Sequence, residues 1–314
     1  MGLTIGVDVG GTKVAAAVVD DQGAIIEKSK RPTPSTDAEK TAAAIAEAVD
    51  ELTAKHQVEA VGLGAAGFVD ETRSVMLFSP NLAWRNEPLK QKVEDRVGLP
   101  VVVENDANAM AWGEARFGAG RDADHLLCIT LGTGIGGGVI IDGELYRGRW
   151  GIGGEWGHLR VVPDGHRCGC GNRGCWEQYA SGNALVREAR DLARVSPAMA
   201  GRLLELGEGT PEGITGPEVT QAAREGDAAA LECFRIIGTW LGQGIADLAA
   251  VLDPGLFIIG GGLSDSGDLL LAPARETYAK VLTGRGHRPV APVRIAELGA
   301  DAGMVGAADL ARRR

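Results

Sequence analysis

The segment Leu3-Thr-Ile-Gly-Val-Asp8-Val9-Gly10-Gly11-Thr12-Lys13 combines alternating apolar residues with a tight glycine turn. The alternation predicts a strand over residues 3–9, and the apolar residues 14–19 predict a second strand that returns after the turn. Asp21-Gln22-Gly23 is a further turn, and Ala24-Ile25-Ile26 begins a third strand. Residues 3–30 are therefore predicted to form a three-stranded meander.

This pattern occurs a second time, with Gly10 corresponding to Gly132 and Asp20 to Asp142, an offset of 122 residues. The second copy comprises His125-Leu-Leu-Cys-Ile-Thr-Leu131, Gly132-Thr133-Gly134, Val139-Ile-Ile141 and Asp142-Gly143. Repetition at a fixed offset predicts an internal duplication, with one phosphate-type turn in each domain.

Strands and helices alternate between and after the two copies. Thr36 and Glu39 have the spacing of a capping box and precede a helical pattern. Strands are predicted over 58–66, 100–104, 256–259 and 293–296, and helices over 105–117, 183–195, 228–252 and 302–312. This order predicts α/β domains with a mainly parallel sheet covered by helices. In the long helix 228–252 the apolar stripe includes Leu231, Phe234, Leu241, Ile245 and Leu248.

Length and composition restrict the class of protein. A chain of 314 residues fits two domains, which we place at residues 1–110 with 301–314 and at residues 111–300. The net charge of -10 argues against a nucleic-acid partner. Neither a signal peptide nor an apolar run of about 18 residues is recognisable, so no membrane association is predicted and a cytoplasmic location is expected.

Three of the five cysteines lie within eight residues, in Cys168-Gly-Cys170-Gly-Asn-Arg-Gly-Cys175-Trp-Glu177. Together with His158 of Glu155-Trp-Gly-His158 they supply the four ligands that a tetrahedral structural zinc takes. A disulfide, or a set of unrelated buried thiols, is the alternative. A Cys-x-Cys bridge would be strained, however, and would leave one thiol unpaired.

Carboxylates stand at both ends of this loop. If His158 binds a metal through one ring nitrogen, its other nitrogen becomes a fixed N–H donor between Glu155 and Glu177. Two acceptors beside one donor would suit a ring of hydroxyl groups. The alternative is that both glutamates are simply solvated, as most glutamates are.

The glycine turns are candidates for binding phosphate. Backbone N–H groups in Gly10-Gly11-Thr12-Lys13 and in the turn that begins at Gly132 can converge on an anion, although each turn alone is equally consistent with an ordinary hairpin. Gly132, Gly134 and Gly137 match a dinucleotide fingerprint by letters, but a predicted strand follows them instead of a helix, which excludes a Rossmann site. Asp8, at the end of the first strand, is placed to hold hydrated magnesium.

Asn105-Asp106 follows a buried strand, where parallel sheets bind their ligands. Both residues are also common helix caps, which is the structural alternative. A hydroxyl group that attacks phosphorus needs a carboxylate to accept its proton, and Asp106 is the candidate for that task.

Taken in order, these motifs resemble the ROK (repressor, open reading frame, kinase) family of sugar kinases, over essentially the whole chain. The motifs are Asp8-Val-Gly-Gly-Thr-Lys13, Gly64-Ala-Ala-Gly67, Glu104-Asn-Asp106, Leu131-Gly-Thr-Gly134, Glu155-Trp-Gly-His158, the cysteine loop and Ile259-Gly-Gly-Gly262. The resemblance is strongest to the members that transfer the γ-phosphoryl group of ATP to the 6-hydroxyl of glucose. It implies two actin-like, ribonuclease-H-like domains with a ligand cleft between them.

The resemblance also implies a role for each matching residue. Asp106 would be the general base, and the sugar would be held by Asn105, Asp106, Glu155, His158, Glu177 and Gly67. ATP and Mg2+ would be bound by Asp8, Gly10, Gly11, Thr12, Lys13, Gly132, Thr133, Gly134, Gly260, Gly261 and Gly262. The structural Zn2+ would be bound by His158, Cys168, Cys170 and Cys175.

Several implications remain open from the sequence. The family usually has a proline before the glycine of the turn that here reads Ala65-Ala66-Gly67-Phe68, which weakens the sugar contact expected of Gly67. The resemblance implies a homo-oligomer. The alternatives are a kinase for another hexose or N-acetylhexosamine, and a sugar sensor that regulates transcription.

Overall fold

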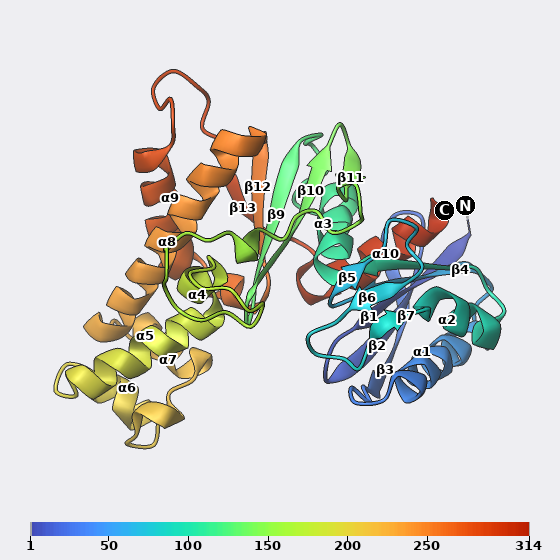
Figure 1. Ribbon diagram of the computed structural model, residues 1–314, viewed down its shortest axis with the longest axis horizontal. Helices are drawn as coiled ribbons and strands as arrows, with labels where there is room; N and C mark the ends of the chain where they lie inside the picture. Colours follow the sequence, from blue (N-terminus) through green and yellow to red (C-terminus); the bar gives the residue numbers. More distant parts are fainter. Residues whose placement is uncertain (1, 314) are drawn as a thin grey trace. The chain divides into compact units, whose positions relative to one another are not determined.

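The computed structural model describes residues 2–313 and divides into two compact units (Figure 1). The first unit contains the chain up to residue 128, residues 137–154 and the chain from residue 296 onward, and the second contains 129–136 and 155–295. The first unit therefore includes residues 111–128 and 137–154, which the sequence placed in the second domain. Whether the ranges 1–110 with 301–314, and 111–300, are independent folding domains stays a prediction.

A five-stranded sheet with the order β3-β2-β1-β4-β8 forms the centre of the first unit. Its strands are β1 (Leu3–Val9), β2 (Lys13–Val19), β3 (Ile25–Pro32), β4 (Val58–Ala65) and β8 (Val101–Asn105). The predicted meander is confirmed, since β1, β2 and β3 pair antiparallel. Only β1–β4 and β4–β8 are parallel, so this sheet is mixed and the prediction of a mainly parallel sheet is only partly correct.

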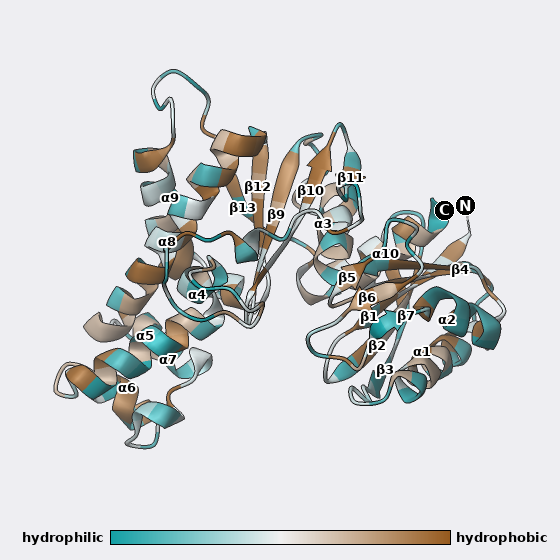
Figure 2. Cartoon of the chain, viewed as in Figure 1, coloured by the Kyte–Doolittle hydropathy of each residue, from teal (hydrophilic) through white to brown (hydrophobic). Residues whose placement is uncertain are grey.

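Helices cover both faces of this sheet. Apolar residues of α1 (Ala38–Thr53) and α2 (Leu89–Val97) pack on one face, while α10 (Ala302–Arg312) packs on the other face and against α3 (Asp106–Phe117). Figure 2 shows the central strands β1 and β4 largely in brown and α2 mostly in teal, as expected for a buried sheet centre beneath an amphipathic helix. The last helix returns to the first unit, as predicted.

Two local features differ from the sequence prediction. The N-cap of α1 is Asp37, whose carboxylate accepts a hydrogen bond from the Lys40 amide, so the capping box predicted from Thr36 and Glu39 is wrong. Residues for which the sequence predicted neither strand nor helix form a small antiparallel sheet of β5 (Phe68–Val69), β6 (Met76–Phe78) and β7 (Arg85–Glu87). Strands of two or three residues are too short to produce a recognisable alternation.

The second sheet has the order β11-β10-β9-β12-β13, which repeats the order of the first with β9 in the place of β1. Its strands are β9 (Leu126–Leu131), β10 (Ile135–Ile141), β11 (Glu144–Tyr146), β12 (Leu256–Gly260) and β13 (Val293–Ile295). The predicted duplication is therefore confirmed at the level of topology. Because β10 is already extended from Ile135, no helix follows the glycine turn, and the rejection of a Rossmann site is confirmed.

The remaining helices belong to the second unit, except for the single-turn η4 (Gly299–Asp301). They are η1 (Trp156–His158), α4 (Glu177–Ala180), α5 (Gly182–Val195), α6 (Gly201–Leu206), η2 (Pro211–Gly213), α7 (Gly216–Arg224), α8 (Ala228–Leu252), η3 (Gly262–Ser266) and α9 (Asp268–Val281). Leu231 of α8 is 40% exposed, so it does not belong to the buried stripe predicted for that helix. Within residues 2–313, no helix combines the length and the apolar character needed to cross a bilayer.

Two glycines of α10 offer a matched test of how closely this helix packs. A Cβ on Gly306 would overlap the carbonyl oxygen of Ala109 in α3, whereas a Cβ on Gly303 would meet nothing within 4 Å. We expect Gly306→Ala to lower the free energy of unfolding by about 1–3 kcal/mol or more through overpacking. Gly303→Ala should leave it unchanged or raise it by up to about 1 kcal/mol. Urea denaturation measures both, and equal effects would contradict this account.

Candidate active site

The β8–α3 junction brings together residues that the sequence predicted separately. In the parallel register Val9 lies beside Ala65, and Ala65 lies beside Asn105, so the carboxyl ends of β1, β4 and β8 form one edge of the sheet. The Asn105 side chain accepts a hydrogen bond from the Asn108 amide at 3.0 Å and is the N-cap of α3. Its Nδ2 also donates to the carbonyl oxygen of Gly67 at 3.0 Å. Asn105 is therefore a helix cap, and it also fixes the Gly67 turn against the start of α3.

Asp106 is the first residue of α3 and is half-buried at this edge. Burial raises the pKa of its carboxyl group, and the Ala107 amide, which donates to Oδ1 at 3.0 Å, partly opposes this effect. A carboxylate with a raised pKa is a better proton acceptor than an exposed one. The position and environment of Asp106 thus suit a general base.

Asp8 faces the same edge. Burial, and then the negative charge of Asp106, raise the pKa of Asp8 to about 6, while Lys13 lowers it. The proximity of two carboxylates is a suitable environment for a divalent cation, whose charge would relieve their repulsion.

The raised pKa of Asp8 predicts a specific dependence of stability on pH. Between its ordinary value of 3.8 and about 6, the folded state keeps a proton that the unfolded state has released. The free energy of unfolding therefore falls as the pH rises through this window. In magnesium-free buffer we expect a decrease of up to about 3 kcal/mol for wild type and a smaller one for Asp8→Asn. Urea denaturation at several pH values measures both, and the same slope in the two proteins would contradict this assignment.

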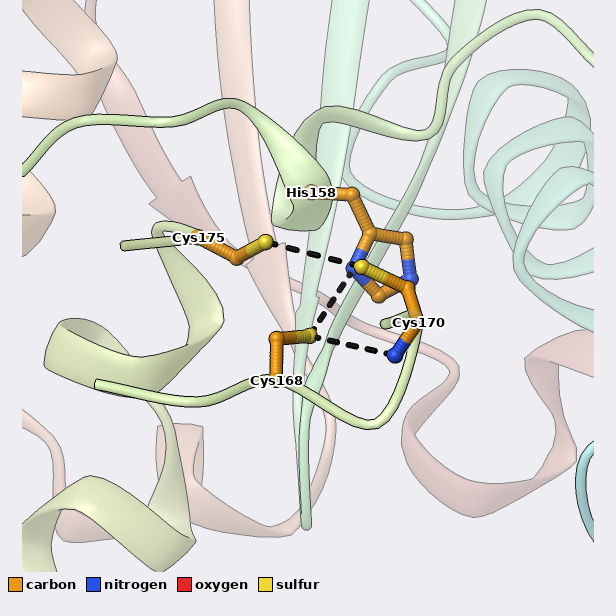
Figure 3. A group of neighbouring side chains, drawn as sticks. All are labelled: His158, Cys168, Cys170 and Cys175. Carbon is orange, nitrogen blue, oxygen red and sulfur yellow. Dashed lines mark hydrogen bonds between the residues drawn. The ribbon is translucent and has the colours of Figure 1, made fainter. Parts of the chain in front are cut away.

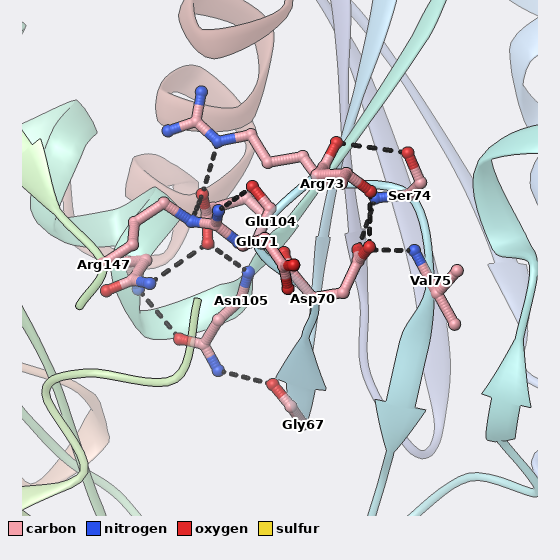
Figure 4. A network of polar contacts seen from close by, with 11 residues as sticks. Gly67, Asp70, Glu71, Arg73, Ser74, Val75, Glu104, Asn105 and Arg147 are labelled. Atoms are coloured by element: carbon pink, nitrogen blue, oxygen red, sulfur yellow. Dashed lines mark hydrogen bonds and ion pairs between the residues drawn. The ribbon is translucent and has the colours of Figure 1, made fainter. Parts of the chain in front are cut away.

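Behind the junction, the sequence analysis missed a buried ionic cluster of Glu104, Arg73 and Arg147 (Figure 4). Glu104 is 1% exposed, and its Oε2 lies 3.1 Å from Arg73 Nε and 2.8 Å from Arg147 Nε. We call these three residues the Glu104 cluster. The position of Glu104 directly before Asn105-Asp106 was the available signal, but nothing in the sequence indicates which arginines would meet it.

In the second unit, His158, Cys168, Cys170 and Cys175 turn toward one another (Figure 3). Their four ligand atoms all lie within 4.8 Å of one another, with His158 Nδ1 3.5 Å from Cys168 Sγ, and Cys170 Sγ 3.6 Å from Cys175 Sγ. Tetrahedral zinc bonds of about 2.0–2.3 Å place ligand atoms roughly 3.4–3.8 Å apart, so this donor set fits zinc. All five cysteines are free thiols, so the disulfide alternative has no support in the structure.

Glu177 lies against this cluster. Its Oε1 is 2.9 Å from Cys168 Sγ and 3.8 Å from His158 Nδ1. A Cβ on Gly134 would overlap the other oxygen of this carboxylate, so Glu177 also adjoins the turn that begins at Gly132. Glu155 immediately precedes η1, which carries His158. Glu177 is therefore not simply solvated, which was the alternative interpretation from the sequence. It is part of a packed polar group.

The two glycine turns differ in their surroundings. The turn at Gly10 is a hairpin in which the Gly10 amide donates to the Lys13 carbonyl at 3.0 Å. The turn at Gly132 opens onto a cavity of about 800 Å³ within the second unit, lined also by Gly262 and by residues of α5 and α7. Gly260 ends β12 and is buried, and the left-handed Gly261 packs against Leu131. The walls from α5 and α7, including Asn183 and Thr220, were missed because no motif marks them.

Comparison with known proteins places the chain in a family. A family model described as the ROK family matches residues 4–314. The chain belongs to the ROK family. The resemblance inferred from the motifs is thereby confirmed.

Individual ROK proteins match over the full chain. The glucokinase of Streptomyces coelicolor is 57% identical over 312 residues, which cover 99% of this chain and 98% of that protein. A crystal structure of a ROK family glucokinase from Streptomyces griseus in complex with glucose and AMPPNP is 58% identical, with a TM-score of 0.91 and 100% of both chains covered. The ROK hexokinase of Thermus thermophilus is 35% identical, with a TM-score of 0.80 and coverage of 99% and 98%. These matches confirm the predicted fold class of two actin-like α/β domains.

The predicted site residues of this ROK chain fall into two groups. Asp8, the turn at Gly10, Gly67, Asn105 and Asp106 lie in the first unit. The second unit contains the turn at Gly132, Glu155, Glu177, the four candidate zinc ligands and the turn at Gly260. The first group lies at the carboxyl edge of the first sheet, whereas Glu155, Glu177 and the candidate zinc ligands lie at η1, at α4 and in the loop between them.

Proposed function

We propose that this protein is an ATP-dependent glucokinase, which transfers the γ-phosphoryl group of ATP to the 6-hydroxyl of glucose. The observation that carries the proposal is its similarity, over the whole of both chains, to the Streptomyces griseus glucokinase in complex with glucose and AMPPNP. The residue chemistry is consistent with it, because a carboxylate with a raised pKa, glycine turns and a nucleotide-sized cavity are all present.

The first unit would supply the proton acceptor. Asp106 takes the proton of the attacking hydroxyl, and Asn105 and the Gly67 turn hold neighbouring hydroxyls of the sugar. The raised pKa of Asp106 supports the role of base. Asp8 and the turn from Gly10 to Lys13 face the phosphates, where bound Mg2+ would supply charge neutralisation.

The second unit would bind the nucleotide and further hydroxyls of the sugar. Gly132, Thr133 and Gly134 hold phosphate, and Gly260, Gly261 and Gly262 flank the adenosine; the cavity of about 800 Å³ is large enough for a nucleotide. The remaining hydroxyl groups of the sugar form hydrogen bonds with Glu155, His158 and Glu177. Nδ1 of His158 faces the thiols, which leaves Nε2–H as the donor. A Zn2+ ion held by His158, Cys168, Cys170 and Cys175 would be structural.

The test is ADP release by the purified protein with magnesium-ATP. Glucose, mannose, fructose, N-acetylglucosamine and N-acetylmannosamine are compared at equal concentration. We expect a rate strongly selective for glucose. Selective turnover of another sugar would make the protein a kinase of that sugar, and binding of glucose without ADP release would favour a sensor.

A further inference from the structure

Glu104 forms hydrogen bonds to residues at both ends of the first turn of α3. Its Oε1 accepts hydrogen bonds from the Asn105 amide at 2.9 Å and from Asn108 Nδ2 at 3.1 Å. The Asn108 amide is in turn bound by the Asn105 side chain. Asp106 lies between these two anchored residues, so its backbone is fixed from both directions.

The other oxygen of Glu104 faces the two arginines, which are themselves anchored. Arg147 donates to the carbonyl oxygens of Asp70 at 2.9 Å and Glu71 at 3.2 Å. Asp70 accepts hydrogen bonds from the amides of Ser74 and Val75, both at 2.8 Å, and this turn carries Arg73. The Arg73 carbonyl accepts from Val103 of β8 at 3.0 Å. The arginines therefore tie Glu104 to the 70–75 turn and to the segment that continues to Glu155.

The negative charge of Glu104 balances the positive charges around it. A carboxylate near the start of α3 is favourable because the helix dipole is positive there. Burial lowers the pKa of Arg73, the carboxylate of Glu104 raises it, and the charge of Arg147 lowers it. Without the carboxylate, two guanidinium groups would face each other and the positive end of the helix.

We propose that the Glu104 cluster is a positioning unit, which fixes the first turn of α3 and thereby orients Asn105 and Asp106 for phosphoryl transfer. Glu104 does not touch substrate in this account and acts through its two neighbours. The inference rests on the proposed kinase function, because Asp106 is the base only in that reaction. The competing explanation is that the cluster contributes to stability alone.

Glu104→Gln separates the two explanations when it is compared with a matched control. Glutamine keeps the shape and the Oε1 acceptor but removes the charge that the arginines need. The control is Glu87→Gln, which neutralises another buried glutamate of the first unit, paired with Lys92 of α2 at 2.6 Å. Both variants lose a buried ion pair, but only Glu104 contacts the start of α3.

Steady-state kinetics are measured at a temperature where both variants are folded. For Glu104→Gln we expect kcat to fall about 100-fold, the loss typical of a misplaced catalytic group. The KM for ATP should stay within about threefold of wild type, because the hydrogen-bond and ion-pair partners of Glu104 line neither the nucleotide cavity nor the glycine turns. Glu87→Gln should retain the wild-type kcat. Equal kcat values for the two variants would overturn the proposal.

Two further measurements cover the remaining outcomes. If Glu104→Gln does not fold, Arg73→Met should lower kcat and Arg73→Lys should restore part of it. A wild-type kcat in Arg73→Met would overturn the proposal.

Hydrogen exchange at amides 105–108 should be faster in Glu104→Gln, or in Arg73→Met, than in Glu87→Gln. Unchanged exchange would overturn the positioning role. An inactive wild type with faster exchange in the variant would instead refute the proposed kinase function alone.

Discussion

Asp106→Asn is expected to lower kcat for glucose phosphorylation by about 100- to 10,000-fold, the range typical of a lost general base. Asparagine has nearly the same shape and can still accept the hydrogen bond that the Ala107 amide donates to Oδ1. The α3 helix should therefore remain intact, and glucose binding, measured by calorimetry, should be largely retained. The loss would then lie in proton acceptance alone.

The control for this substitution is Asp37→Asn, at the start of α1 in the same unit. Asp37 caps α1 through its side chain, and asparagine is an equally good N-cap, so this variant should keep the wild-type kcat. For wild type, kcat should rise as the pH rises through the raised pKa of Asp106, because only the ionised carboxylate accepts a proton. A wild-type rate in Asp106→Asn would show that Asp106 is not the base.

Cys170→Ser is expected to remove zinc and to destabilise the second unit strongly. Structural zinc sites have apparent binding energies of about 10–16 kcal/mol in small domains, and this energy contributes directly to folding. Cys170 is exposed, so the substitution removes almost no buried apolar surface. A large fall in Tm would therefore report the loss of the metal. The metal content is measured by atomic emission, with one zinc per chain expected in wild type.

Cys233→Ser provides the comparison. Cys233 is a buried thiol of α8 in the same unit and lies outside the group of four candidate ligands. This variant should keep one zinc per chain. Its free energy of unfolding should fall only by the modest amount expected when a polar group is placed in the core. One zinc per chain in Cys170→Ser would remove Cys170 from the ligand set.

Much of the fold could be predicted because its signals are local. The apolar alternation and the glycine turns located the first two strands of each sheet, and the 122-residue offset revealed the duplication that the two strand orders share. The helices predicted over 105–117, 228–252 and 302–312 match α3, α8 and α10 to within a residue. The candidate zinc ligands were also accessible, because three of the four lie within eight residues of sequence.

Other features depend on which segments meet in space. The sequence contains Arg73, Glu104 and Arg147, but only the docking of the 70–75 turn beside β8 brings the two guanidinium groups to one buried carboxylate. Glu177 could be marked as a polar residue near the zinc loop, yet its contact with Cys168 depends on how the loop folds.

The sequence by itself therefore determined the two copies of the fold, the family and the types of residue at each site. The tertiary structure decided which charges are buried together, and thereby which pKa values are raised. Patterns with a period of two or 3.6 residues are local and can be recognised in the sequence. Burial and charge pairing, in contrast, depend on segments that are far apart in sequence.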